Sequence, residues 1–126
     1  MAWLAVGIGG ALGSLARHAV NVFFGHVLQS SVPYATATVN LAGSFVIGLL
    51  AGLIAHGTIP MSANLRTFVF VGLLGGFTTF SSFALDTLTL SHGGQISTAF
   101  WNVTVQVLLG LAAVFGGYSI GVGQVG

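Results

Sequence analysis

The stretch Gly75-Gly76-Phe77-Thr78-Thr79-Phe80-Ser81-Ser82-Phe83 lies in the middle of a long apolar segment and carries a glycine pair and four hydroxyl residues. A membrane-spanning helix would prefer leucine at such positions. Paired glycines lower helix propensity, and Ser and Thr side chains can take over backbone hydrogen bonds that a break frees. In a bilayer, non-helical backbone is tolerated only where it is buried in protein or lines a polar cavity. The stretch therefore predicts a broken helix with an ion or solute site near the membrane midplane.

The composition of the chain indicates a membrane protein. The sequence is 55% hydrophobic and 2% charged, and its mean hydropathy is +1.03. Its only formal charges are Arg17, Arg66 and Asp86, too few to keep a soluble domain in solution. There is no cysteine, hence no disulfide or thiolate site, and no set of base, nucleophile and metal ligands that suggests an enzyme. We expect a lipid bilayer as its environment and no nucleic-acid partner.

The apolar segments predict an all-α membrane protein with four transmembrane helices. Each segment has roughly twenty residues or more, enough to cross about 30 Å of hydrocarbon at about 1.5 Å per residue. The four helices form a single domain over residues 1–126, and the third is broken at the midplane. The expected spans are residues 3–24, 34–55, 65–90 and 96–118. In the second, Gly48 and Gly52 form a GxxxG pair suited to close helix packing.

The two arginines lie toward opposite sides of the membrane in this arrangement. Arg17 is near the end of the first span and Arg66 is at the beginning of the third. The positive-inside rule then favours neither orientation. Such a balance is typical of a dual-topology protein, whose copies insert both ways and pair as an antiparallel homodimer. We interpret Arg17 as structural, either reaching toward the nearer interface or pairing with Asp86.

The predicted break has the chemistry of an ion site. Gly75 and Thr78 lie roughly 14–18 Å along the helix from Arg66, about halfway across the bilayer. Backbone carbonyls that lose their helical partners there can bind a dehydrated hard cation such as sodium. Phe80 and Phe83 are three residues apart, on nearly the same face, and the positive edge of an aromatic ring can stabilise an anion without holding it tightly. Polar side chains expected to donate hydrogen bonds to a small anion are Asn40, Thr79, Ser81 and Ser82.

Three segments of the chain resemble the Fluc (CrcB) family of fluoride channels. Residues 9–17, GGALGSLAR, resemble the glycine-rich first helix of the family with its arginine. Residues 36–44, TATVNLAGS, resemble the second-helix motif with its asparagine. Residues 75–83, GGFTTFSSF, resemble the third-helix signature and are the most specific of the three. Together with the length and the four-span layout, the resemblance covers nearly the whole chain.

The resemblance implies an antiparallel dual-topology homodimer with two passive pores that select fluoride over chloride. It implies export of fluoride from the cytoplasm across the bacterial inner (plasma) membrane. It also implies a structural sodium ion at the dimer centre, held by the backbone carbonyls of Gly75 and Thr78 from both subunits. The resemblance places Phe80 and Phe83 on the fluoride path, with Asn40 positioning them.

The resemblance also implies roles for further residues and leaves some positions without a match. Ser81 and Thr36 would belong to the polar track of the pore. The chain departs from the family at His18 and Asp86, where the family more often has an aromatic residue and a glutamate. The polar residues of the fourth span do not align one by one; they are Asn102, Thr104 and Gln106.

Two other functions remain open from the residues alone. A small dual-topology multidrug or guanidinium exporter also uses four short spans, but it needs an intramembrane carboxylate to exchange protons for its substrate. Asp86 is the only acidic residue and lies near a span end, which counts against this alternative. A non-transporting accessory subunit of a membrane complex would not need paired phenylalanines beside a broken, hydroxyl-rich helix.

Overall fold

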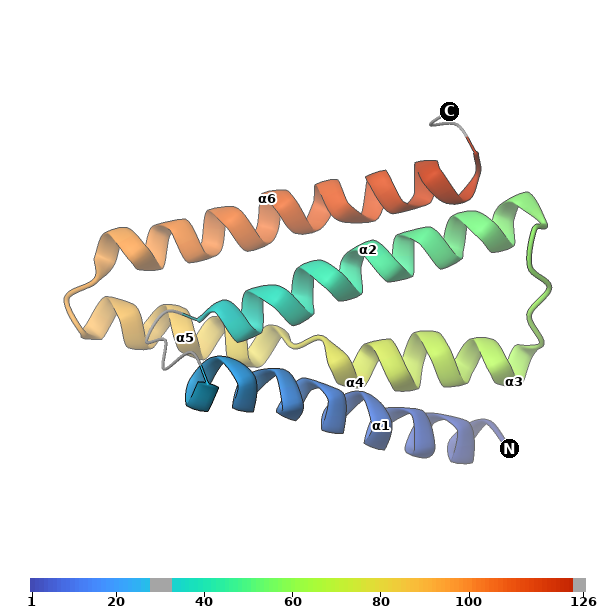
Figure 1. Ribbon diagram of the computed structural model, residues 1–126, viewed down its shortest axis with the longest axis horizontal. Coiled ribbons are helices and arrows are strands. Elements are labelled where there is room, and N and C mark those ends of the chain that lie inside the picture. The colour runs from blue at the N-terminus through green and yellow to red at the C-terminus, as the bar shows by residue number, and fades with distance from the viewer. Residues whose placement is uncertain (28–32, 124–126) are drawn as a thin grey trace.

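The computed structural model describes residues 1–27 and 33–123, and within them it contains helices and no strands (Figure 1). The predicted all-α architecture is confirmed for this part of the chain. In chain order the elements are α1 (Ala2–Val22), the π-helix η1 (Phe23–Val27), α2 (Tyr34–His56), α3 (Ala63–Arg66), the π-helix η2 (Thr67–Leu74), α4 (Gly75–Phe77), α5 (Phe80–His92) and α6 (Ile96–Gly121).

The helices associate in two parallel pairs. In Figure 1, α1 runs in the same direction as the segment from α3 to α5, while α2 and α6 run together in the opposite direction. The most extensive contacts join α2 to α6 and α1 to η2, and α5 also packs on α6. The broken segment therefore lies between α1 on one side and the α2–α6 pair on the other.

Glycines allow α2 and α6 to cross with their backbones in contact. A methyl group at Gly48 would collide with the carbonyl of Val114, and one at Gly117 would collide with the carbonyl of Phe45. Gly52 faces the carbonyl of Tyr118 in the same way. The prediction that the GxxxG pair of the second span packs closely against another helix is confirmed.

A second glycine contact joins α1 to η2 and α4. A Cβ atom on Gly9 would lie 2.5 Å from the carbonyl oxygen of Phe68, and one on Gly76 would lie 2.7 Å from that of Gly10. These positions admit no larger residue unless the helices separate, because the obstructing atoms belong to the backbone. The wide π-helical turn of η2 in this contact was not predicted from the sequence.

The helix break lies at Thr78 and Thr79, and this corrects one expectation. Both residues are extended, with φ/ψ of −86°/160° and −154°/120°, between α4 and α5. A break within this stretch was predicted, but the glycine pair was wrongly expected to cause it. Gly75 and Gly76 are helical, and the small size of Gly76 instead serves the contact with α1.

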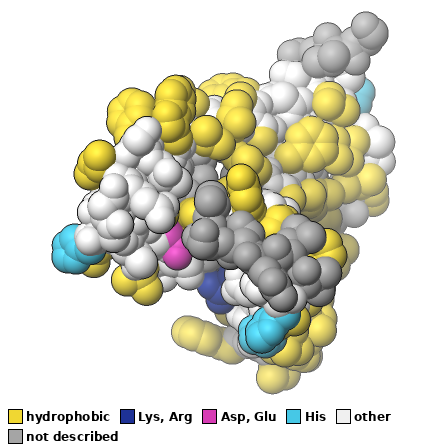
Figure 2. Space-filling view, turned by 60° about the vertical axis from the view of Figure 1, so that its left-hand side comes forward, with side chains coloured by type: hydrophobic (Ala, Val, Ile, Leu, Met, Phe, Trp, Pro, Cys, Tyr) yellow, Lys and Arg dark blue, Asp and Glu magenta, His cyan; other side chains and the backbone are white. Residues whose placement is uncertain are grey.

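Three stretches of the described chain are long and apolar enough to cross a membrane, namely Tyr34–His56, Ala63–His92 and Ile96–Gly121. The helix α1 has 21 residues but is not among them, because Arg17, His18 and Asn21 lower its hydropathy. Figure 2 shows many hydrophobic side chains on the face of the protein that it draws. Trp3 is 90% exposed and Phe115 is 71% exposed, as expected of side chains that face lipid.

Candidate functional site

The side chain of Asn40 on α2 holds the helix break. Its Oδ1 accepts a hydrogen bond from the backbone N–H of Thr79 at 2.8 Å, and its Nδ2 donates to the carbonyl of Thr79 at 3.0 Å. One amide therefore satisfies both backbone groups of a residue that has left the helix. Because unpaired backbone groups are costly away from water, this pairing stabilises an extended residue inside a transmembrane segment.

The hydroxyl of Thr79 caps the next helix, α5. Its Oγ1 accepts from the backbone N–H of Ser82 at 3.2 Å and caps the N-terminus of α5. The same hydroxyl donates to the Oγ of Ser82 at 3.2 Å and lies 3.5 Å from the Oγ of Ser81. The positive end of the α5 dipole therefore lies beside Ser81 and Phe80, where it favours negative charge.

Backbone carbonyls at the break lose their helical partners as a result, those of Gly75 and Thr78 among them. In a continuous helix the carbonyl of Gly75 would accept from the N–H of Thr79, and that of Thr78 from the N–H of Ser82. These N–H groups donate instead to the side chains of Asn40 and Thr79. Gly75 and Thr78 are the two residues whose carbonyls the family resemblance implies as sodium ligands. Carbonyl oxygens freed in this way suit a hard cation.

The two phenylalanines lie together on the first turn of α5. The ring centroids of Phe80 and Phe83 are 5.5 Å apart, and the ring planes meet at 54°. Phe80 is 77% exposed and Phe83 is half-buried. The tilted arrangement leaves ring edges, which carry the positive part of the aromatic quadrupole, free to face a ligand.

A cavity of about 300 Å³ opens on this face of the protein. Its lining brings five of the predicted site residues together, while Phe83, Ser81 and Thr36 are not part of it. The residues that line the cavity are Asn40, Gly43, Ser44, Ile47, Phe70, Leu74, Gly75, Thr78, Thr79 and Phe80. None of them is titratable, and no metal-binding cluster of His, Cys, Asp or Glu occurs in the described part of the chain.

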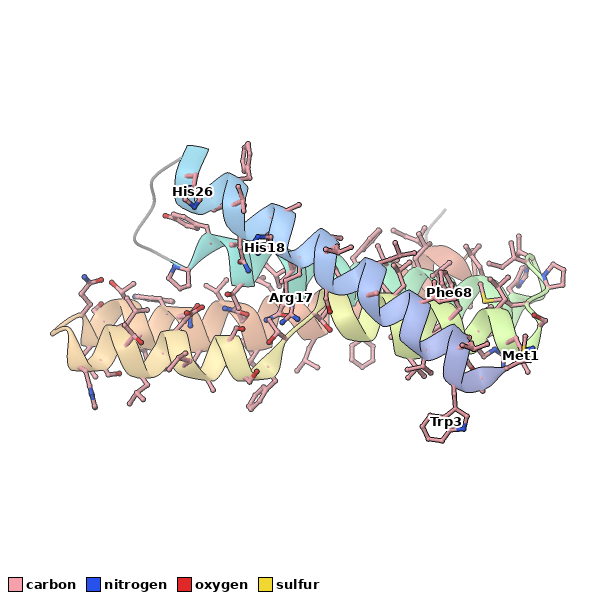
Figure 3. All side chains as sticks on the ribbon, turned by 90° about the horizontal axis from the view of Figure 1, so that it is seen from below. Met1, Trp3, Arg17, His18, His26 and Phe68 are labelled. Atoms are coloured by element: carbon pink, nitrogen blue, oxygen red, sulfur yellow. The ribbon has the colours of Figure 1, made fainter. Side chains whose placement is uncertain are left out.

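Thr36 and Asp86 form a second polar contact between α2 and α5. The hydroxyl of Thr36, a buried residue one turn before Asn40, donates to Oδ2 of Asp86 at 2.8 Å. Figure 3 shows the side chain of Arg17 extending from α1 toward the link between α4 and α5. The partner that the structure gives Asp86 is thus Thr36 rather than Arg17.

A chain of buried amides on α6 continues the network, and its connections were not predicted. The Nδ2 of Asn40 also donates to Oε1 of Gln106 at 2.7 Å, and Nε2 of Gln106 donates to Oδ1 of Asn102 at 2.8 Å. Asn102 then donates to the hydroxyl of Thr87 at 3.0 Å. The four-residue spacing of Asn102 and Gln106 indicated a shared polar face, but not the helix that this face contacts.

The hydrogen bonds of Asn40 correct its expected role as a donor to an anion. Both N–H bonds of its amide are already used, one by the carbonyl of Thr79 and one by Gln106. Asn40 thus has no amide hydrogen left for a ligand in this arrangement. Its contacts are those of a residue that positions the break, which is the role that the family resemblance implies.

The fold and the site define a small multi-pass membrane protein with a helix break of the kind that transport proteins use for ions. The chain belongs to the CrcB family: the family model described as CrcB-like protein, Camphor Resistance (CrcB), matches residues 4–118. The resemblance noted from the three motifs is thereby confirmed.

Several relatives are similar over nearly their full length. The fluoride-specific ion channel FluC of Paracoccus denitrificans is 49% identical over 121 residues, which cover 96% of this chain and 94% of the relative. The protein of the same name from Rhodospirillum centenum is 48% identical over 117 residues, covering 93% and 92%. That of Thermus thermophilus is 42% identical over 124 residues, covering 98% and 96%.

Proposed function

We propose that this protein is a passive, fluoride-selective ion channel that exports fluoride from the cytoplasm across the bacterial plasma membrane. The names of its relatives support fluoride as the permeating ion. The observation that carries the proposal is the position of Phe80 and Phe83 on the first turn of α5, directly after a break that side chains stabilise. It is a channel and not an enzyme.

The proposed path runs past the two rings and the neighbouring hydroxyls. Fluoride loses part of its hydration shell and meets the positive ring edges of Phe80 and Phe83, the N-terminal end of α5, and the hydroxyl of Ser81, while the hydroxyl of Thr79 caps α5 beside the path. These groups attract an anion weakly enough to release it, as conduction requires. The buried Thr36 lies beside the path, one turn before Asn40, and its hydroxyl donates to Asp86. Since no titratable side chain lines the cavity, transport is not coupled to protons.

We further propose four membrane spans, with α1 as the first, and an antiparallel dual-topology homodimer. Since α1 and the segment from α3 to α5 run in the same direction (Figure 1), Arg17 near the end of one and Arg66 at the start of the other lie toward opposite ends. Phe80 is 77% exposed in the single chain and borders the open cavity. A second copy over this face would enclose the path.

A structural sodium ion fits the carbonyls of Gly75 and Thr78, whose helical donors bond elsewhere. We propose that these carbonyls, from both copies, hold the ion. When bound, the ion supplies positive charge that offsets the carbonyl ends of the two half-helices.

Fluoride efflux from liposomes that contain the purified protein tests the proposed function. We expect rapid fluoride release, little chloride movement measured in parallel, and loss of fluoride release in Phe80→Ile. Phe100→Ile is the matched control, because Phe100 is also an exposed phenylalanine but packs against Trp101 on α6, away from the break. A well-folded dimer that releases neither ion would overturn the channel and leave the accessory-subunit alternative.

A further inference from the structure

The amide network on α6 has a single direction, which is set by the backbone at the helix break. The N–H of Thr79 can only donate, so Asn40 must present its oxygen to it and its nitrogen to Gln106. Gln106 must then accept with its oxygen and donate with its nitrogen, and the same holds for Asn102. The chain ends where the hydroxyl of Thr87 donates to the carbonyl of Phe83 at 2.9 Å.

No amide in this chain can flip without placing two donors or two acceptors against each other. The side chains of Asn102 and Gln106 are also nearly inaccessible, at 9% and 7% exposure. Buried polar networks that are fully satisfied fix one arrangement, whereas partly satisfied ones are costly. The part of α6 that carries them is anchored through contacts with both α2 and α5.

We infer that Gln106 and Asn102 are positioning residues: they lock the amide of Asn40, and through it the extended peptide of Thr79 that precedes Phe80. The effect on conduction rests on the proposed channel function. The fixing of the Asn40 amide, which we call the lock, does not rest on that function, because it follows from the hydrogen bonds alone. The network links the residue before Phe80 to the peptide of Phe83, so it fixes both rings relative to α6.

A direct role of these amides in binding the permeating ion is the competing explanation. Gln106 and Asn102 also border a cavity of about 180 Å³ between the N-terminal ends of α2 and α6. Thr87 separates the two explanations, since it belongs to the network but lines neither this cavity nor the one at the break. Thr87→Val removes its hydroxyl at nearly constant volume.

Fluoride efflux from liposomes is the first readout. We expect Gln106→Met to slow efflux about tenfold, which corresponds to about 1.4 kcal/mol. Thr87→Val, at the far end of the network, should slow it about threefold, as expected for the loss of one weaker link. Thr104→Val is the matched control on α6, because the hydroxyl of Thr104 bonds only to the carbonyl of Phe100 in its own helix, at 2.9 Å; it should conduct like wild type.

Hydrogen exchange of the side-chain amide of Asn40 is the second readout, and it does not depend on conduction. The chain has four asparagines, so selective ¹⁵N labelling resolves them by NMR, and the Asn40 signal is assigned by its loss in Asn40→Leu. We expect slow exchange in wild type and exchange at least about tenfold faster in Gln106→Met, because one N–H loses its acceptor.

The two readouts separate the inference from the proposed function. A wild-type protein that does not conduct fluoride contradicts the proposed channel function. Faster Asn40 exchange in Gln106→Met would in that case still support the lock. Unchanged exchange of Asn40 in Gln106→Met overturns the inference. If Gln106→Met does not fold, Thr87→Val is the deciding variant. Its second readout is the exchange of the Asn102 side-chain amide, which donates to Thr87. Wild-type efflux together with wild-type exchange of Asn102 in Thr87→Val would overturn the inference.

Discussion

Removing the hydroxyl of Thr79 should loosen the helix break without changing its packing volume. Thr79→Val keeps the β-branched shape that suits the extended backbone of this residue. It deletes the acceptor for the N–H of Ser82 and the donor to the Oγ of Ser82, both at 3.2 Å. Thr79→Ser keeps the hydroxyl and should behave like wild type.

The size of the effect follows from the cap. Loss of an N-cap hydroxyl costs about 0.5–2 kcal/mol and typically ~1 kcal/mol. Thr79 is half-buried, so water replaces only part of the lost bond, and a cost of about 1 kcal/mol is expected. A change of this size shifts the balance between the ordered and the loosened break about fivefold. Since Phe80 is the next residue, we expect fluoride efflux to fall by a similar factor.

The same substitution should weaken the proposed sodium site. Without its cap, the N–H of Ser82 becomes available to the carbonyl of Thr78, its acceptor in a continuous helix. A carbonyl that accepts this bond is a poorer sodium ligand. An ion present at about 100 times its dissociation constant stabilises the folded state by about 2.7 kcal/mol. The rise in the thermal midpoint in sodium, relative to a large organic cation, should therefore be smaller in Thr79→Val than in wild type.

Ser62→Ala provides a control for the loss of a cap. Ser62 caps α3 by accepting from the N–H of Leu65 at 3.2 Å, at an exposed position away from the break. Its loss should lower the thermal midpoint but leave efflux and the sodium effect unchanged. A Thr79→Val variant that conducts fluoride like wild type and keeps the full sodium effect would show that the Thr79 cap does not hold the break. A Thr79→Ser variant that loses as much as Thr79→Val would show the same.

Two further predictions concern the frame that holds the site. Gly117→Ala should lower the free energy of unfolding by about 1–3 kcal/mol, and with it the thermal midpoint, because its methyl group meets backbone of α2. The matched control Gly116→Ala places its methyl group in open space and should keep the wild-type midpoint. Equal midpoints for the two variants would contradict the close crossing of α2 and α6. Thr36→Val should cost about 1–2 kcal/mol in unfolding experiments by removing the donor to Asp86. The exposed Thr38→Val should change stability by less than about 0.5 kcal/mol, and a matching loss there would contradict a specific contact.

The location of the helix break shows which part of the fold the sequence can predict. The hydroxyl residues and the glycine pair indicated a break between residues 75 and 83, since both disfavour a regular apolar helix. The choice between Gly76 and Thr78 depended on a neighbouring helix. Gly76 stays helical where α1 approaches within contact of its backbone, and this proximity is not visible in local propensity.

The role of Asn40 shows the same limit in the site. An asparagine in an apolar helix must find partners, so the sequence could predict that Asn40 bonds to something polar. Its partners lie 39 and 66 residues away, on the break and on α6. Which of several polar faces it meets depends on how α2 pairs with α6, and that pairing is set by glycines whose partner helix the sequence does not identify.

The break places free carbonyl oxygens and a helix N-terminus close together without an ionisable residue. Side chains from α2 and from the break itself take the N–H groups of Thr79 and Ser82, and this leaves the carbonyls of Gly75 and Thr78 without their helical donors. The negative end of one half-helix and the positive end of the next then lie two extended residues apart. The proposed sodium ion and the proposed fluoride path would each meet a suitable pole there, so the ion chemistry that we propose needs no ionisable side chain at the break.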